Sequence, residues 1–186
     1  MSSIILIQEI SRDTFMAFEE MKRIIVIGSP GAGKSTFARK LKEKTGLPLY
    51  YLDMIFHRPD RTTVTREEFD QKLQAILKTD NWIIDGNYQR TLPLRFEACT
   101  DVFFLDFPLD LCLEGAAARI GTVRDDMPWV EQEFDPEFRQ YILDFPDNQL
   151  PQIYELVDKY RDSRRITVFH SREEADRWLE SQNDGL

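Results

Sequence analysis

Apolar runs and helical periodicities alternate along most of this chain. Five apolar runs, rich in β-branched and aromatic residues, predict strands near residues 24–28, 49–52, 82–85, 101–106 and 165–169. Apolar residues recurring at helical spacing predict helices near residues 34–45, 65–77, 92–98, 108–119, 135–145 and 150–161, with a last helix after residue 171. Such alternation is typical of an α/β fold, with a parallel sheet and helices on both of its faces.

Local residues support several of these boundaries. Thr65 with Glu68, and Ser171 with Glu174, form capping boxes that predict helix starts. Gly46 predicts the end of the first helix. Between the second strand and Thr65, the sequence predicts a loop that begins at Asp53.

The pattern predicts one domain with two less regular parts. Residues 21–186 are expected to form the domain, and residues 1–20 an N-terminal appendage of uncertain structure, with Met21 as a plausible alternative start. Residues 120–134 lack clean periodicity. An irregular stretch that follows a helix is what a mobile lid looks like, so we expect this segment to be lid-like.

Composition narrows the class of protein. A chain of 186 residues with 42% hydrophobic residues can bury a proper core, and it lacks an apolar run of membrane-spanning length. The net charge of −9 argues against direct binding of nucleic acids, which normally requires a basic surface. Cys99 and Cys112 have no metal-ligand neighbours and are too few for a disulfide scaffold. We therefore expect a cytoplasmic monomer or homodimer.

The first strand runs into a phosphate-binding motif. The motif G-x-x-x-x-G-K-[ST] begins at Gly28 and ends at Ser35. Its glycines allow backbone N–H groups to approach phosphate oxygens, and the following helix directs its positive end to the same place. The residues expected to bind the nucleotide are Gly28, Ser29, Pro30, Gly31, Ala32, Gly33, Lys34, Ser35 and Thr36. The alternative is a glycine-rich turn without a ligand.

This motif implies ATP as the phosphate donor and Mg²⁺ as the metal. Lys34 is expected to reach the β and γ phosphates, and the Ser35 hydroxyl to bind Mg²⁺. Phosphoryl transfer then requires an acceptor placed in line with the phosphate and protected from water. The expected partners are accordingly a nucleoside triphosphate and a small-molecule phosphate acceptor.

Three carboxylates follow predicted strands and should meet at one edge of a parallel sheet. Asp85 and Asp106 each end an apolar strand, so both are candidates for holding Mg²⁺. Asp53 follows the second strand, where it could orient or deprotonate an acceptor hydroxyl. The alternative for all three is an aspartate that only caps a loop or helix.

Two arginines flank the start of the lid-like segment. Arg119 and Arg124 could close over the phosphates and neutralise charge in the transition state. The alternative is that each pairs with the negative end of the preceding helix. We expect the functional role for both.

Several motifs together resemble the adenylate-kinase-related DNA topology modulation proteins. The resemblance covers residues 22 to about 180 and depends on segments 24–36, 82–88, 104–108, 124–127 and 133–138. It implies a three-layer P-loop fold of the nucleotide-kinase type, with a five-stranded parallel sheet in the order 2-3-1-4-5 and an ATP site. The name of that family suggests an effect on DNA topology, which the acidic composition does not support as a direct activity.

The match to nucleotide kinases is incomplete near the expected acceptor. In those enzymes the third strand ends in Asp-Gly-Phe-Pro-Arg, whose Asp is near Mg²⁺ and whose Arg binds the phosphate of the acceptor. Here Asp85 and Gly86 match, residues 87–89 differ, and Arg90 comes one place late. Arg119 and Arg124 approximate the arginine pair at the start of the adenylate kinase lid, with one extra residue between them.

The leading hypothesis is an ATP-dependent, Mg²⁺-dependent kinase whose acceptor is a nucleotide, a nucleoside or another hydroxylated metabolite. The second hypothesis is a regulatory NTP-binding protein that hydrolyses slowly and changes conformation. A nucleic-acid-associated protein is a third hypothesis, and the net charge of −9 disfavours it.

Overall fold

A computed structural model describes residues 18–181 of the chain. Five parallel strands form one sheet in the order β2-β3-β1-β4-β5, which confirms the expected topology. The strands are β1 (Arg23–Gly28), β2 (Leu49–Tyr51), β3 (Trp82–Asp85), β4 (Asp101–Leu105) and β5 (Arg165–Phe169). The helices are η1 (Phe18–Glu20), α1 (Lys34–Thr45), α2 (Leu52–Phe56), α3 (Arg66–Leu77), η2 (Gln89–Thr91), α4 (Leu92–Ala98), α5 (Leu109–Ala117), α6 (Pro136–Asn148), α7 (Leu150–Tyr160) and α8 (Arg172–Ser181).

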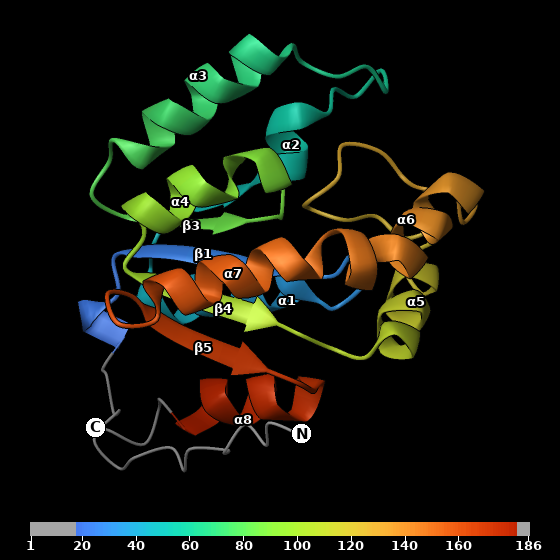
Figure 1. Cartoon of the computed structure of the whole chain (residues 1–186). Helices are drawn as coiled ribbons and strands as arrows, with labels where there is room; N and C mark the ends of the chain where they lie inside the picture. The colour runs from blue at the N-terminus through green and yellow to red at the C-terminus, as the bar shows by residue number, and fades with distance from the viewer. Residues whose placement is uncertain (1–17, 182–186) are drawn as a thin grey trace.

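The sheet separates two hydrophobic cores. Ile24 and Val26 of β1 face one core, to which α1, α5 and α8 contribute, whereas Ile25 and Ile27 face the other, which α3, α4 and α7 cover. In Figure 1 the strands follow one another from β3 down to β5, α7 crosses in front of them, and α8 lies below β5. Since both faces are covered, the central strands are apolar throughout rather than alternating.

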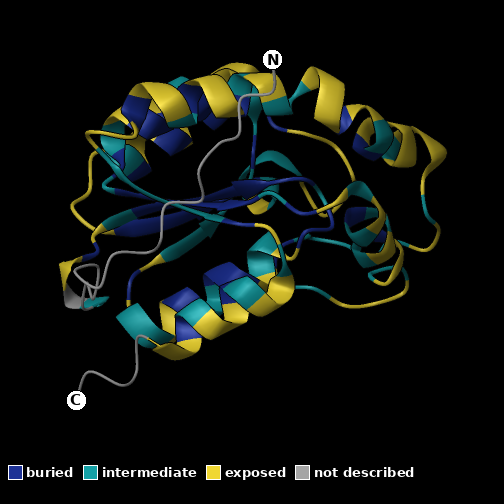
Figure 2. Cartoon of the chain, turned by 60° about the horizontal axis from the view of Figure 1, so that its bottom comes forward, coloured by how far each residue is buried: buried dark blue, intermediate teal, exposed yellow. Residues whose placement is uncertain are grey.

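Burial follows this layering closely. The central strands are buried along nearly their whole length, whereas the helices alternate buried and exposed positions (Figure 2). The predicted capping residues Thr65 and Ser171 accept hydrogen bonds from the backbone N–H groups of Glu68 and Glu174, at 3.1 and 3.2 Å. Gly46 ends α1 in the left-handed conformation expected there.

The register of the sheet determines which strand ends meet. Val26 lies opposite Asp85 of β3, and Gly28 lies opposite Leu105 of β4. The carboxyl ends of β1, β3 and β4 therefore form one edge, where the loop after β1 leads into α1.

Some element boundaries differ from the sequence predictions. The loop expected from Asp53 to Thr65 begins with the short helix α2. Leu52, its first residue, packs against Gly86, and the His57 N–H donates to the Asp53 carbonyl at 2.9 Å, which closes the helical turn. The helix α5 ends at Ala117, before Arg119. The expected appendage 1–20 lies outside the described residues except for η1.

The helix α6 continues beyond the expected residue 145 to Asn148, with Pro146 in its last turn. Residues 120–134 contain no helix or strand, as the missing periodicity indicated. Within residues 18–181, none of the helices combines the length and the apolar character needed to cross a membrane.

Candidate functional site

The loop from Gly28 to Thr36, here called the phosphate loop, is built on left-handed glycines packed closely against α5. Gly31 has φ = 83°, and a Cβ atom there would lie 1.9 Å from the carbonyl oxygen of Cys112. A Cβ atom on Gly115 of α5 would lie 2.1 Å from the Gly31 carbonyl oxygen. Glycine is thus required on both sides of this contact.

Lys34 lies at the first position of α1, beneath the lid-like segment. Its Nζ donates to the carbonyl oxygen of Ser29, 3.0 Å away. Burial lowers the pKa of Lys34, and the negative charge of Asp85 partly opposes that shift. The ammonium group therefore has few polar partners and is available to a phosphate.

Ser35 connects two carboxylates. Its hydroxyl lies 2.8 Å from Oδ2 of Asp85 and also within hydrogen-bond distance of Oδ2 of Asp126. Asp85 is 5% exposed, and its Oδ1 atom is buried without a hydrogen-bond partner. Burial raises the pKa of Asp85 to about 6, although Lys34 and the Ser35 hydroxyl act in the opposite direction.

These three residues fit the donor set of a magnesium ion. Mg²⁺ is usually held by one or two carboxylates together with hydroxyl, phosphate and water oxygens. Within residues 18–181, no group of three or more His, Cys, Asp or Glu side chains is arranged to hold a metal ion without further ligands. The unpartnered oxygen of Asp85 is the observation that fits a cation completed by nucleotide oxygens.

Asn87 fastens the β3 end to the phosphate loop. Its Oδ1 accepts from the Gly28 N–H at 3.0 Å, and its Nδ2 donates to the Gly28 carbonyl at 2.6 Å. Arg95 supports this loop from below: it is fully buried and donates to the carbonyl oxygens of Gly86 and Asn87. Burial lowers the pKa of Arg95 to about 9.

Asp53 lies in the first turn of α2, facing the same edge of the sheet. The Tyr88 hydroxyl donates to Asp53 Oδ1 at 2.8 Å. Burial, followed by the charge of Asp53, raises the pKa of Tyr88, so this phenol remains a proton donor to the carboxylate. Tyr88 has φ = 40°, which is uncommon for a residue other than glycine.

The two predicted arginines both lie over the phosphate loop. Arg124 donates to both oxygens of Asp126 at 2.9 Å and to Oε2 of Glu131 at 2.6 Å. Burial lowers the pKa of Arg124, but Asp126 and Glu131 outweigh it and leave the pKa raised. Arg119 packs over the Phe138 ring, and its Nε is buried without a partner.

Asp106 lies apart from this cluster. Its side chain accepts a 2.8 Å hydrogen bond from the Tyr154 hydroxyl, and its N–H donates to the Phe169 carbonyl of β5. Because Leu105 already lies opposite Gly28, Asp106 comes one residue further along and turns toward β5 and α7. Asp126, which the sequence analysis gave no role, is the second carboxylate on Ser35 instead.

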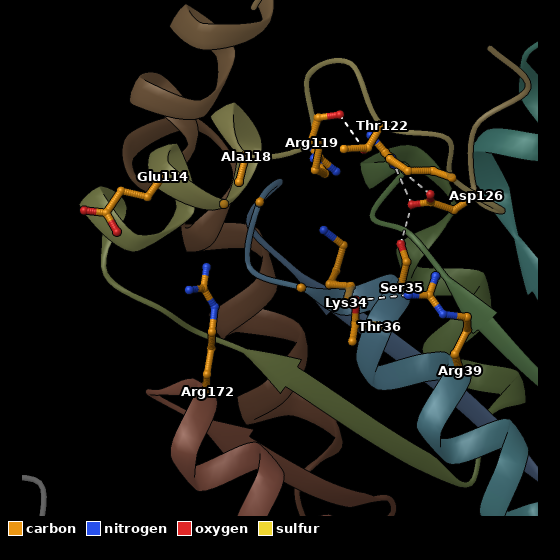
Figure 3. A pocket seen from close by; sticks show the side chains of 14 residues that line it. Lys34, Ser35, Thr36, Arg39, Glu114, Ala118, Arg119, Thr122, Asp126 and Arg172 are labelled. Atoms are coloured by element: carbon orange, nitrogen blue, oxygen red, sulfur yellow. Dashed lines mark hydrogen bonds and ion pairs between the residues drawn. The ribbon is translucent and has the colours of Figure 1, made fainter. Parts of the chain in front are cut away.

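Two cavities meet at the phosphate loop. One, of about 510 Å³, lies between the loop, α5 and α8, and Figure 3 shows Lys34 and Arg119 directed into it. The other, of about 650 Å³, lies beyond Asp53 and Asp85, under the lid-like segment. Their shared wall consists of Lys34, Ser35, Arg119, Arg124 and Asp126. We name them the donor cavity and the acceptor cavity for the roles that we propose for them.

Several residues of these cavities were missed by sequence reasoning. Asn87 and Tyr88 follow the predicted strand-end Asp85-Gly86 and belong to segment 82–88 of the resemblance, but the sequence analysis gave neither of them a role. The donor cavity is also lined by Arg172, which is exposed, and by Arg39, which is partly buried, and the sequence gives no indication of a site at either position.

Comparison with curated proteins finds partial matches to adenylate kinases. The adenylate kinase of Thermotoga neapolitana is 30% identical over 88 residues, covering 46% of this chain and 39% of the relative. That of Clavibacter michiganensis subsp. michiganensis is 32% identical over 79 residues, covering 41% and 37%. The matches thus span about two fifths of these relatives. No protein-family profile matches the chain.

Comparison with solved structures shows the fold. Shikimate kinase from Acinetobacter baumannii in complex with shikimate gives a TM-score of 0.57 at 20% identity, covering 91% of this chain and 98% of that one. A gluconokinase from Sinorhizobium meliloti 1021 gives 0.53 at 16% identity, covering 90% and 91%. The chain therefore has the same fold as these two enzymes. The DNA topology modulation type is not among these likenesses and stays a prediction.

Proposed function

We propose that this protein is an ATP-dependent phosphotransferase, which passes the γ-phosphoryl group of ATP to a hydroxyl of a small molecule with the help of Mg²⁺. One observation carries the proposal: a donor cavity and an acceptor cavity share the wall that holds Lys34, Ser35 and both lid arginines. A protein that only hydrolyses a nucleotide needs no second cavity there. The partial adenylate kinase matches and the kinase fold support the same activity.

The donor cavity suits a nucleoside triphosphate. The phosphate loop offers backbone N–H groups at the N-terminus of α1, and Lys34 points its ammonium into the cavity (Figure 3). Arg119 and Arg124 also line this cavity. Positive groups fixed in this way stabilise charge that develops on the transferred phosphoryl group.

Bound Mg²⁺ would neutralise charge on the phosphates and hold them in place. Ser35 and Asp85 would hold it, with Asp126 as a further carboxylate in reach of Ser35. Asp126 now bonds to Arg124 and to Ser35 at the same time, so nucleotide binding would redistribute these contacts.

Asp53 is the proposed general base. Tyr88 occupies one of its oxygens, which orients the carboxylate in the acceptor cavity. As the acceptor oxygen forms a bond to the γ-phosphorus, the bond from that phosphorus to the β–γ bridging oxygen breaks. ADP leaves with that electron pair, and the acceptor hydroxyl proton passes to Asp53.

Two measurements test the proposal. Isothermal titration should detect ATP binding in the presence of Mg²⁺, and Lys34→Ala should abolish it. A coupled ADP-release screen over nucleosides, nucleotides and sugars should then find acceptor-dependent turnover. Unchanged ATP binding in Lys34→Ala would contradict the donor site, and slow hydrolysis independent of every acceptor would favour a regulatory NTPase.

A further inference from the structure

The walls of the acceptor cavity are acidic away from the phosphate loop. Asp53, Glu133 and Asp135 line the cavity there together with Arg61, whereas Arg119 and Arg124 belong to the wall shared with the donor cavity. Arg124 donates to Glu131, which also lines the acceptor cavity. The surroundings of a bound acceptor therefore carry more negative than positive charge, which is unfavourable for an anion.

The arginines nearest to the β3 end are already engaged elsewhere. Arg90 forms a two-pronged ion pair with Asp70, at 2.6 and 3.0 Å. Arg95 is fully buried and donates to backbone carbonyls beneath Asn87. Neither side chain lines the acceptor cavity, so neither is in position for a phosphate carried by the acceptor.

Two residues that line the cavity each have a buried polar atom without a hydrogen-bond partner. Gln89 donates through its Nε2 to the Gln149 carbonyl, which leaves its Oε1 buried and unpaired. The Nδ1 atom of His57 is likewise buried without a partner. An amide oxygen is satisfied only by a donor, and hydroxyl or amine groups supply donors whereas a phosphate supplies acceptors.

Aromatic rings complete the cavity. His57 and Trp129 meet edge to face with centroids 5.0 Å apart, and Tyr88, Phe138 and Tyr141 line other parts of the wall. Such surfaces pack against planar or alicyclic rings and attract organic cations.

From these four features we infer that the acceptor is a hydroxylated ring compound, neutral or cationic, that carries no phosphate or carboxylate group. A nucleoside or an amino sugar belongs to this class, whereas a nucleoside monophosphate or a sugar acid does not. The inference depends on the proposed function and specifies its substrate class.

The test uses matched acceptor pairs in the ADP-release assay: nucleosides against their 5′-monophosphates, and amino sugars against gluconate and shikimate. The neutral or cationic member should have a kcat/KM higher by roughly tenfold or more, because the negative charge of the anionic member is repelled by the carboxylates of the cavity. Preference for the anionic member, equal use of both, or failure of every neutral and cationic compound to bind in titration would overturn the inference.

A charge reversal sharpens the test. Glu133→Lys should reduce the preference by improving kcat/KM for the anionic member of a pair. The matched control is Glu137→Lys, which makes the same charge change on the exposed start of α6 outside the cavity and should leave the preference unaltered. An unchanged preference in folded Glu133→Lys would count against the inference.

The assay separates this inference from the proposed function. If the wild-type protein binds ATP and phosphorylates monophosphates in preference to nucleosides, the kinase proposal stands and the substrate inference fails. If Lys34→Ala binds ATP as well as the wild type does, the kinase proposal itself fails.

Discussion

Asp85 has, at the scale of one residue, the environment that the proposed cation site requires. Its carboxylate is buried, hydrogen-bonded by Ser35 through one oxygen only, and has its pKa raised to about 6 by burial. The folded-state pKa therefore exceeds the ordinary unfolded value of about 3.9. Stability from this group falls as pH rises from about 4 to 6, and the ionised carboxylate costs stability above that window.

Asp85→Asn should stabilise the ligand-free protein at pH 7 and abolish its activity. The amide removes a buried charge, so we expect thermal unfolding to shift upward by about 2–6 °C. Calorimetry without nucleotide measures the first effect, and Mg²⁺-dependent ATP titration measures the loss of binding. A lower melting temperature together with intact Mg²⁺-dependent binding would contradict the role given to Asp85.

Nucleotide binding should depend on pH in the direction that follows from Asp85. Mg²⁺ requires the ionised carboxylate, so affinity for ATP with Mg²⁺ should decline as the pH falls through about 6. Titrations between pH 5 and pH 8 measure this decline, whereas Asp85→Asn should show the lost binding at every pH in this range. Affinity that increases toward pH 5 would oppose the assignment.

Asn87 forms hydrogen bonds with the backbone of one residue, Gly28, and its replacement should lower the stability of the protein. Asn87→Ala leaves the buried N–H and C=O of Gly28 without partners, so we expect a loss of about 2–3 kcal/mol in unfolding free energy and weaker ATP binding. Denaturant unfolding and ATP titration measure the two effects. Asn81→Ala, at an exposed position just before β3, is the matched control. Equal stability of the two variants would contradict a stabilising role for the two hydrogen bonds between Asn87 and Gly28.

At the scale of elements, the lid-like segment is closed over the phosphate loop through side chains rather than through regular structure. The two ends of the segment are joined by the Gly121 N–H, which donates to the Glu131 carbonyl at 2.7 Å. Within the segment, Arg124 forms an ion pair with Asp126. Asp126 then reaches Ser35. A segment held by such exchangeable polar contacts can rearrange when phosphates arrive.

Arg124→Ala should therefore impair the chemical step more than nucleotide binding. Loss of a cation that stabilises transition-state charge is expected to lower kcat by about 100-fold, with a smaller change in KM for ATP. Steady-state kinetics distinguishes the two parameters. Arg139→Ala, on the exposed face of α6, removes the same charge elsewhere and should have wild-type kinetics. A pure KM effect would mean that Arg124 contributes only to binding.

Elements with strong periodicity were predictable from the sequence, and irregular ones were not. α1 has the expected bounds because its apolar positions, its phosphate-loop start and Gly46 all agree. α2 was missed because Leu52 continues an apolar run, so that nothing local separates strand from helix. The contact of Asp126 with Ser35 joins residues 91 positions apart in the chain, and no local pattern reports such a contact.

For the whole molecule, the parallel sheet explains why most predicted site residues come together. The ends of β1, β2 and β3 lie at one edge, so the phosphate loop, Asp53 and Asp85 line one continuous pair of cavities. Asp106 ends a strand at the same edge, but its position toward β5 separates it from Ser35. Strand order alone predicts the edge, whereas register and side-chain direction decide which carboxylates meet.

The central claim is that phosphate passes from the donor cavity directly into the acceptor cavity. The most direct measurement follows ATP labelled in its γ-phosphoryl group in the presence of acceptor, in the wild type and in Lys34→Ala. We predict labelled acceptor in one-to-one ratio with ADP, and a loss of both products in Lys34→Ala. Label that appears only as free phosphate, at a rate independent of the acceptor, would contradict the claim.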